Sequence, residues 1–281
     1  MTEKHSSFSV VMPVYAGDDP EYVEKAVESL NKQTQPPDEV LIVVDGPIPE
    51  DLEQILSKWL EGADLTVRSY RLKSNQGLGK ALREGVVEAT HDIIARMDAD
   101  DVSVETRFED QLSFLRHNPS VDVVGGQILE FDTELNEPIA ERAVPSTHDE
   151  IVKEARFRSP MNHATVMFRR GAVLDAGNYR PVDRMEDYDL WVRMIMNGST
   201  FANLSKNLLY VRAGRDFFGR RGSIEYAREE FNRQTEFYRR GFISLPRYII
   251  NTLLRVPFRL VPDSVRELIY RRFARSNPDQ S

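Results

Sequence analysis

The chain has 281 residues, 41% of them hydrophobic, which is enough for one large α/β domain with an appendage. It contains no cysteine, so disulfides and thiolate metal sites are excluded, and a metal ion would need carboxylate or histidine ligands. No apolar run reaches the roughly 18 residues of a membrane span and no signal-peptide pattern opens the chain, so we expect a cytoplasmic protein.

The formal net charge of −8 is unevenly distributed along the chain. Residues 239–281 contain nine Arg and three acidic residues, which leaves a net charge of −14 on residues 1–238. An acidic body repels polyanions, so we expect no nucleic acid among its partners. The basic tail, in contrast, is suited to an anionic surface.

The first 130 residues alternate short apolar runs with helical patterns, which predicts βαβ units and a largely parallel sheet. Strands are predicted over 8–14, 39–45, 65–70 and 92–97, and helices over 21–33, 50–60, 77–89 and 105–117. Ligands in open α/β sheets bind beyond the carboxyl ends of the strands. Tyr15, Asp45 and Asp98 lie at three such ends, so we expect them to face one crevice.

After residue 121 the pattern is mixed, with strands predicted over 121–131 and 164–168 and a helix over 187–196. Residues 214–222 contain three glycines and no periodicity, which indicates a mobile loop or lid. Two amphipathic segments follow, over 245–260 and 263–273. We therefore expect one domain over 1–220, with halves over 8–130 and 131–220, and a basic helical segment over 221–281.

The acidic run Asp98-Ala99-Asp100-Asp101 follows a predicted strand. One carboxylate of such a pair can accept a sugar or base hydroxyl, while the other holds Mg²⁺ or Mn²⁺ together with diphosphate oxygens. A solvated acidic loop would look the same, and so would a helix N-cap at Asp101 or Ser103. The run alone leaves these alternatives open.

Two further stretches are compatible with nucleotide binding. Asp45 with Gly46 ends a strand where a carboxylate can contact a base or ribose, and an ordinary Asp-Gly turn explains it nearly as well. The segment 75–85 (NQGLGKALREG) places glycines at a helix start, where backbone amides can approach a nucleotide. It lacks the GK[ST] ending of a P-loop.

A second acidic cluster, Glu186-Asp187-Tyr188-Asp189, begins the predicted helix over 187–196. A carboxylate at a helix N-terminus is stabilised as the anion, which suits a general base for an acceptor hydroxyl, and helix capping is the simpler explanation. His163 is a candidate for the acceptor site, and a packed structural histidine is an equal alternative.

Taken together, the motifs resemble the inverting family 2 glycosyltransferases, in particular small members that build surface polysaccharides and exopolysaccharides. The resemblance covers about residues 8–212 and depends on the order and spacing of seven motifs. These are VVMPVY at 10–15, VVDG at 43–46, NQGLGKALREG at 75–85, RMDADD at 96–101, Arg107 with Gln111, NHATVMFRR at 162–170 and EDYDLW at 186–191.

The resemblance implies an α/β fold of the A-type nucleotide-sugar transferase class, Rossmann-like and mostly parallel, with a C-terminal helical appendage. It implies that residues 1–220 are the catalytic domain, with a nucleotide-sugar half (8–130) and an acceptor half (131–220). It implies that Asp98 contacts the nucleoside sugar, that Asp100 coordinates Mn²⁺ or Mg²⁺, and that Asp187 is the catalytic base. Glu186 would position the acceptor and Trp191 would wall its pocket, with His163 as a further candidate there. The residues expected around the nucleoside are Pro13, Tyr15, Asp45, Asn75 and Gly77.

The chain departs from family patterns at two places. It lacks the Gln-x-x-Arg-Trp motif of processive members, which favours addition of a single sugar. The segment YVRAGRDFFGRRG at 210–222 also lacks the histidine that many relatives carry after the corresponding strand, so Arg212 or Arg215 is a candidate to face the diphosphate.

The predicted function is therefore inverting transfer of one sugar, a hexose, from a nucleotide-diphosphate donor to a hydroxyl of a lipid-linked or growing surface glycan. A sugar-nucleotide pyrophosphorylase and a non-catalytic nucleotide-sugar binding protein are the alternatives. The basic amphipathic tail suggests a peripheral contact with the anionic inner face of the cell membrane, whereas packing on the catalytic body or a dimer contact would also explain it.

Overall fold

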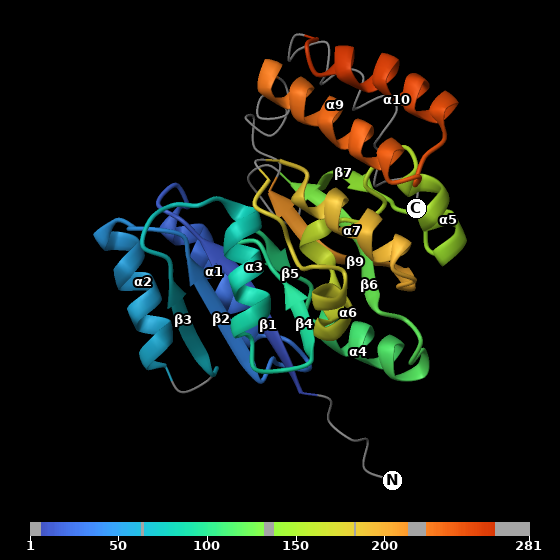
Figure 1. Ribbon diagram of the computed structural model, residues 1–281. Helices are drawn as coiled ribbons and strands as arrows, with labels where there is room; N and C mark the ends of the chain where they lie inside the picture. Colours follow the sequence, from blue (N-terminus) through green and yellow to red (C-terminus); the bar gives the residue numbers. More distant parts are fainter. Residues whose placement is uncertain (1–6, 63–64, 132–137, 183, 213–222, 262–281) are drawn as a thin grey trace.

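The first half of the computed structural model contains the predicted βαβ units (Figure 1). The structure describes residues 7–62, 65–131, 138–182, 184–212 and 223–261. All eight elements predicted in this half are confirmed, with ends that differ by a few residues. They are β1 (Phe8–Val14), α1 (Pro20–Asn31), β2 (Glu39–Val44), α2 (Glu50–Glu61), β3 (Val67–Arg71), α3 (Leu78–Glu88), β4 (Ile93–Arg96) and α4 (Arg107–His117).

The second half of the described chain holds shorter elements and one long strand. They are β5 (Val102–Ser103), β6 (Val123–Phe131), β7 (Pro138–Arg142), α5 (His148–Ala155), the 3₁₀ turn η1 (His163–Thr165), β8 (Met167–Arg169), α6 (Arg170–Asp175), α7 (Glu186–Met196), β9 (Phe201–Arg212), α9 (Ile224–Arg239) and α10 (Leu245–Phe258). The strand predicted over 164–168 is displaced, because residues 163–165 form the 3₁₀ turn. The long strand β9 was not predicted.

Within the described residues, nine strands form one sheet in the order β3-β2-β1-β4-β8-β6-β9-β5, with β7 paired to β6. Strands β1 to β4 are parallel, and β8 then runs antiparallel to β4. The carboxyl ends of β1, β2 and β4 therefore meet at one edge. In β1, Val10 and Met12 face the cluster formed with α1, α2 and α4, while Val11 faces the cluster formed with α3 and α7. Both faces of the sheet are thus buried, as parallel sheets require.

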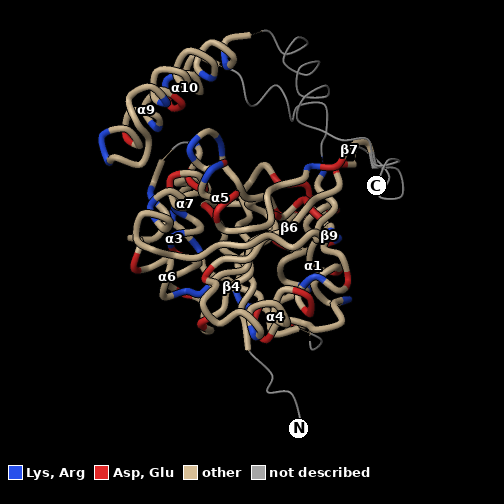
Figure 2. The backbone as a smooth tube through the Cα atoms, turned by 90° about the vertical axis from the view of Figure 1, so that its right-hand side faces the viewer, with Lys and Arg blue, Asp and Glu red and all other residues tan. Residues whose placement is uncertain are grey.

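The helices α9 and α10 form a hairpin at one end of the molecule, next to α5 and α7 (Figures 1 and 2). Phe237 of α9 packs against Tyr188 and Val192 of α7 in a small apolar cluster. Helix α10 matches the segment predicted over 245–260. The predicted segment over 263–273 and the predicted lid over 214–222 lie outside the described residues. In the part of the chain that the structure describes, no helix has the length and apolar character needed to cross a bilayer.

Candidate active site

A cavity of about 530 Å³ opens beyond the carboxyl ends of β1, β2 and β4. This is the edge where strand ends in open α/β sheets form ligand sites. The three residues predicted to share a crevice, Tyr15, Asp45 and Asp98, all line it. The lining consists of Pro13, Val14, Tyr15, Asp18, Asp45, Asn75, Gly77, Leu78, Ala81, Arg96, Asp98, Ala99, Asp100, Asp101, Val211 and Arg212.

Asp45 fixes the loop that precedes α3. Its carboxylate accepts hydrogen bonds from the backbone amides of Gln76, at 2.7 Å, and Gly77, at 2.8 Å. Gly46 brings the β2 end against this loop, because a Cβ there would lie 2.4 Å from the Asn75 nitrogen. Asp45 is thus more than a turn residue. It holds Asn75 and Gly77 at the cavity wall.

Tyr15 stands at the exposed side of the same cavity, with 44% of its surface accessible. Its backbone N–H donates to the Asp18 carboxylate at 2.9 Å, and its carbonyl accepts from the Asp18 amide at 3.1 Å. This turn places the tyrosine at the cavity with its ring partly exposed, and such a ring can stack on a flat partner such as a base.

The acidic run also lines the cavity and is anchored by arginine. Buried Arg96 pairs with the Asp98 carboxylate. The Asp101 side chain is buried and accepts the backbone N–H of Arg212 at 3.1 Å. Burial, with the charges of Asp98 and Asp100, raises the pKa of Asp101 well above its usual range.

The helix-capping alternative for this run is wrong. Helix α4 begins after Thr106, while Ser103 belongs to β5 and Asp101 is tied to β9. The run is therefore part of the cavity lining and does not cap a helix.

The electrostatics of the cavity suit a cation. Burial raises the pKa of the Asp18 carboxyl to about 7, and the charges of Asp100 and Asp98 act in the same direction. Among the described residues no three acidic or histidine side chains form a complete metal cluster. An ion here would need oxygens from a bound diphosphate to complete its coordination, which is the way Mg²⁺ is commonly held in nucleotide sites.

Arg212, at the end of β9, brings a positive charge to the same cavity. Its guanidinium carbon lies 3.7 Å from the centre of the Tyr22 ring and 4.6 Å from that of Phe131. Two aromatic faces stabilise a cation and limit its motion. Arg212 is thus well placed for a phosphate, and Arg215 lies outside the described residues.

The second acidic cluster forms the first turn of α7. Ser159 donates a hydrogen bond to Asp187 through its Oγ, at 2.9 Å from Asp187 Oδ2. Burial, followed by the charge of Asp187, raises the pKa of Glu186 to about 7, and the charge of Asp98 adds to this effect. The two acidic stretches, almost ninety positions apart, are therefore close enough for their charges to interact, although neither Glu186 nor Asp187 is among the cavity-lining residues.

His163 lies beside Glu186 and packs against Trp191. The His163 Nε2 is 2.9 Å from the Tyr179 hydroxyl, and its Nδ1 is 3.9 Å from Glu186 Oε1. Burial lowers the pKa of His163 well below its usual range, so the imidazole is neutral at pH 7. Trp191 has no exposed surface and packs edge-on against His163 and Phe201. Contact of either residue with an acceptor stays a prediction.

A sequence model for the family described as Glycosyl transferase family 2 matches residues 9–180, more than half of the chain. The chain belongs to glycosyltransferase family 2. This glycosyltransferase is 34% identical over 98% of its length to UDP-Gal:alpha-D-GlcNAc-diphosphoundecaprenol beta-1,3-galactosyltransferase of Escherichia coli, 99% of which is covered. It is 36% identical over 94% of its length to amylovoran biosynthesis glycosyltransferase AmsE of Erwinia amylovora, 98% of which is covered.

Comparison with solved structures confirms the predicted A-type fold of the glycosyltransferase. The mannosyltransferase PcManGT from Pyrobaculum calidifontis, solved with GDP-Man and Mn²⁺, superposes with a TM-score of 0.67 at 17% identity. The match covers 98% of this chain and 78% of that structure.

Sequence reasoning missed three residues of the glycosyltransferase site. Asp18 lies in the stretch that follows β1 and belongs to none of the seven motifs. Ser159 and Tyr179 carry no motif, and only the fold brings them to Asp187 and His163. A search for polar residues beside the predicted acceptor motifs would have suggested Ser159.

Proposed function

We propose that this glycosyltransferase moves one sugar, a hexose, from a nucleotide-diphosphate donor to a hydroxyl of a lipid-linked or growing surface glycan, with inversion. The observation that carries the proposal is the convergence of the Asp98–Asp101 run with the acidic turn of α7. In this arrangement a leaving diphosphate and an attacking hydroxyl would each meet a dedicated carboxylate. The family assignment does not support the alternatives of a pyrophosphorylase or a binding protein without activity.

Asp100 would hold Mn²⁺ or Mg²⁺ together with the donor diphosphate, and the bound ion would offset the charge that develops on the leaving group. The acidic cavity and the Mn²⁺ bound in the PcManGT structure support a metal. Arg212 would face the same diphosphate. Tyr15, the Asp45-held loop and Asp98 would bind the nucleoside.

Asp187 would take the proton from the acceptor hydroxyl while that oxygen attacks the anomeric carbon from the face opposite the leaving group. A single displacement of this kind inverts the carbon. Ser159 would orient the carboxylate, and Glu186 would donate to or accept from the acceptor. The printed acceptor of the Escherichia coli relative, a diphosphoundecaprenol-linked sugar, supports a lipid-linked acceptor for this chain.

Direct binding and turnover measurements test this proposal. Nucleotide sugars are screened by thermal shift with and without Mn²⁺, because a ligand that binds only the native state raises its apparent stability. A preferred donor is then incubated with lipid-linked sugar acceptors, and nucleotide release is measured. We expect metal-dependent stabilisation and acceptor-dependent release. Stabilisation without release in any acceptor mixture would favour a binding protein instead.

We also propose that α10 lies on an anionic membrane. Its inner side is polar, since Asn251 is fully buried and Arg255 and Arg259 pair with buried Glu230 of α9. Its outer side is apolar and accessible, with Leu253 68% exposed. The other exposed apolar residues in α10 and just after it are Leu245, Ile249, Ile250, Leu254 and Leu260.

This arrangement reverses that of an ordinary surface helix, which buries its apolar stripe. Residues 239–261 contain no acidic residue and five Arg, of which Arg255 and Arg259 pair with Glu230 and Arg240 pairs with Glu236. The other two, Arg239 and Arg247, are exposed and can contact anionic lipid headgroups. Leucines beside arginines on one helix are typical of segments that lie in the plane of a membrane interface.

Cosedimentation with vesicles of phosphatidylglycerol, compared with phosphatidylcholine, tests the membrane proposal. We expect binding to the anionic vesicles that is lost in the double variant Leu253→Glu with Leu254→Glu and kept in Leu174→Glu, an exposed leucine of α6. Both Leu and Glu favour helix, so the fold is preserved. Equal sedimentation of wild type and double variant would refute the proposal, as would a wild-type dimer that the double variant abolishes.

A further inference from the structure

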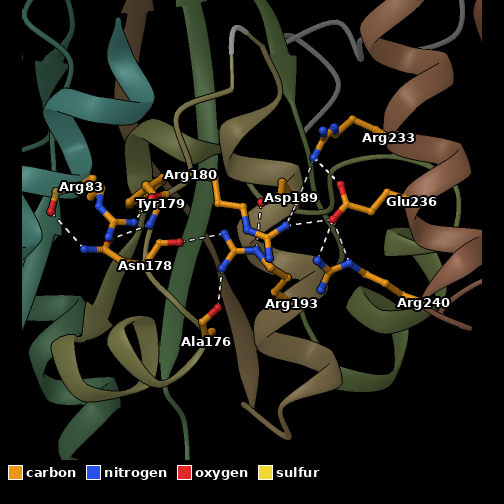
Figure 3. Close-up of polar contacts among 10 residues, drawn as sticks. All are labelled: Arg83, Ala176, Asn178, Tyr179, Arg180, Asp189, Arg193, Arg233, Glu236 and Arg240. Carbon is orange, nitrogen blue, oxygen red and sulfur yellow. Dashed lines mark hydrogen bonds and ion pairs between the residues drawn. The ribbon is translucent and has the colours of Figure 1, made fainter. Parts of the chain in front are cut away.

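The carboxylate of Asp189 is buried between three guanidinium groups. Arg193 of the same helix donates to Asp189 Oδ2 at 2.9 Å, and Arg233 of α9 donates to Oδ1 at 3.0 Å. The Arg180 guanidinium lies 3.7 Å from Oδ1. Asp189 is only 1% exposed along its side chain, so its charge depends on these partners (Figure 3).

Glu236 of α9 completes the cluster from the hairpin side. Its carboxylate pairs with Arg180 at 2.8 Å, with Arg233 at 2.8 Å and with Arg240 at 2.7 Å. Arg180 and Arg233 thus each bridge Asp189 of α7 to Glu236 of α9 (Figure 3). The hairpin is joined to the catalytic body by charged hydrogen bonds in addition to its apolar contact.

The same cluster is also linked to residues near the donor cavity and near the candidate base. Asp189 lies two positions after Asp187 in the first turn of α7. The backbone carbonyl of Arg180 lies where a side chain on Gly79, at the start of α3, would be. Arg193 also donates to the Asn178 carbonyl at 2.8 Å, next to Tyr179.

From these contacts we infer that Arg233 and Glu236 are positioning residues for the transfer reaction. They hold, from the hairpin, the first turn of α7, which carries Glu186 and Asp187. The inference rests on the proposed function. It gives α9 a role in the reaction, in addition to any role of the hairpin in membrane binding.

The physical reason lies in how a helix turn is held. Within α7, Arg193 pairs with Asp189 from one turn further along the helix, and its bond to the Asn178 carbonyl holds this part of the helix to the body. Arg233 comes from another element and holds the same carboxylate, at the first turn of α7, from the hairpin side. A base must stand within hydrogen-bond reach of its proton, and misplacement by about 1 Å can lower the rate on the order of a hundredfold.

The variant Arg233→Met tests this inference in the full chain. The side chain keeps much of its volume and loses the donor to Asp189. We expect kcat to fall about tenfold or more with little change in the KM for the donor, the pattern of a lost transition-state interaction. Arg228→Met, an exposed arginine on the same helix, is the matched control and should keep wild-type kcat.

Two further variants separate positioning from loss of stability. Arg233→Lys keeps the charge and should regain part of kcat, and Glu236→Gln keeps the shape and should lower kcat less than Arg233→Met does. All rates are measured at a temperature where circular dichroism shows the variant folded. If Arg233→Met does not fold, Glu236→Gln decides the question in the same assay.

The outcomes are distinct from those of the proposed function. Wild-type enzyme that releases no nucleotide with any acceptor would refute the function. Active wild type, with folded Arg233→Met and Glu236→Gln both within twofold of its kcat, would overturn the positioning role alone. A lower melting temperature with unchanged kcat would likewise leave these residues a purely stabilising role.

Discussion

Gly79 of α3 lies next to Glu186, in the first turn of α7, where the nucleotide-sugar half meets the acceptor half. A Cβ on Gly79 would lie 3.3 Å from the Glu186 Cβ and 2.6 Å from the carbonyl oxygen of Arg180. A side chain there would displace the backbone at Arg180 and press on Glu186. The glycine in the sequence NQGLG therefore sets the separation between the nucleotide loop and the candidate acceptor carboxylates.

We predict that Gly79→Ala lowers transfer activity about tenfold and stability by about 1–3 kcal/mol, because backbone must move to admit the methyl group. Urea unfolding and nucleotide release measure the two effects. Gly171→Ala is the matched control, since that glycine begins α6 with no neighbouring atom within 4 Å. There alanine should be neutral or stabilise by up to about 1 kcal/mol.

Asp187→Asn should lower transfer by about 10²–10⁴-fold and leave donor binding nearly unchanged, because an amide cannot accept the acceptor proton. Ser159→Ala should also lower transfer, but only about tenfold, since the Asp187 carboxylate stays and loses one orienting hydrogen bond. Nucleotide release and thermal shift with donor measure both. Wild-type turnover in Asp187→Asn would mean that another group is the base.

Glu186 should make stability depend on pH near neutrality. Burial and the charge of Asp187 raise its folded pKa to about 7 from the ordinary 4.5. The contribution of Glu186 to the free energy of unfolding is thus complete below pH 4.5 and is lost as the pH rises through 7. Glu186→Gln should match wild type at pH 4.5 and exceed it by up to about 3 kcal/mol at pH 8, in urea unfolding series. Parallel pH curves for the two proteins would contradict this.

Glu230 should show the opposite dependence. Burial alone would raise its pKa, but Arg255 and Arg259 prevail and lower it to about 2 from 4.5. The stabilisation is present above pH 4.5 and is lost as the pH falls from 4.5 towards 2. Glu230→Gln should cost about 3 kcal/mol at pH 7 and progressively less below pH 4.5. Exposed Glu61→Gln, at the end of α2, is the control, and both variants are unfolded with urea.

The sequence by itself determined the parallel half of the sheet and the donor side of the site. Apolar runs such as residues 39–44 and the helices between them are local patterns, and parallel strand ends meet at one edge, so Tyr15, Asp45 and Asp98 could be placed together. The A-type fold followed from the order of the motifs and is confirmed by comparison.

Only the tertiary structure decided how the second half closes onto this edge. Strand β9 alternates poorly and was not predicted, because its neighbours β5 and β6 and its register shifts come from distant segments. The contacts of Ser159 with Asp187 and of Arg233 with Asp189 join residues 28 and 44 positions apart. Such pairs leave no periodic signal, since hydrogen bonds between side chains depend on where the folded elements meet and not on local spacing.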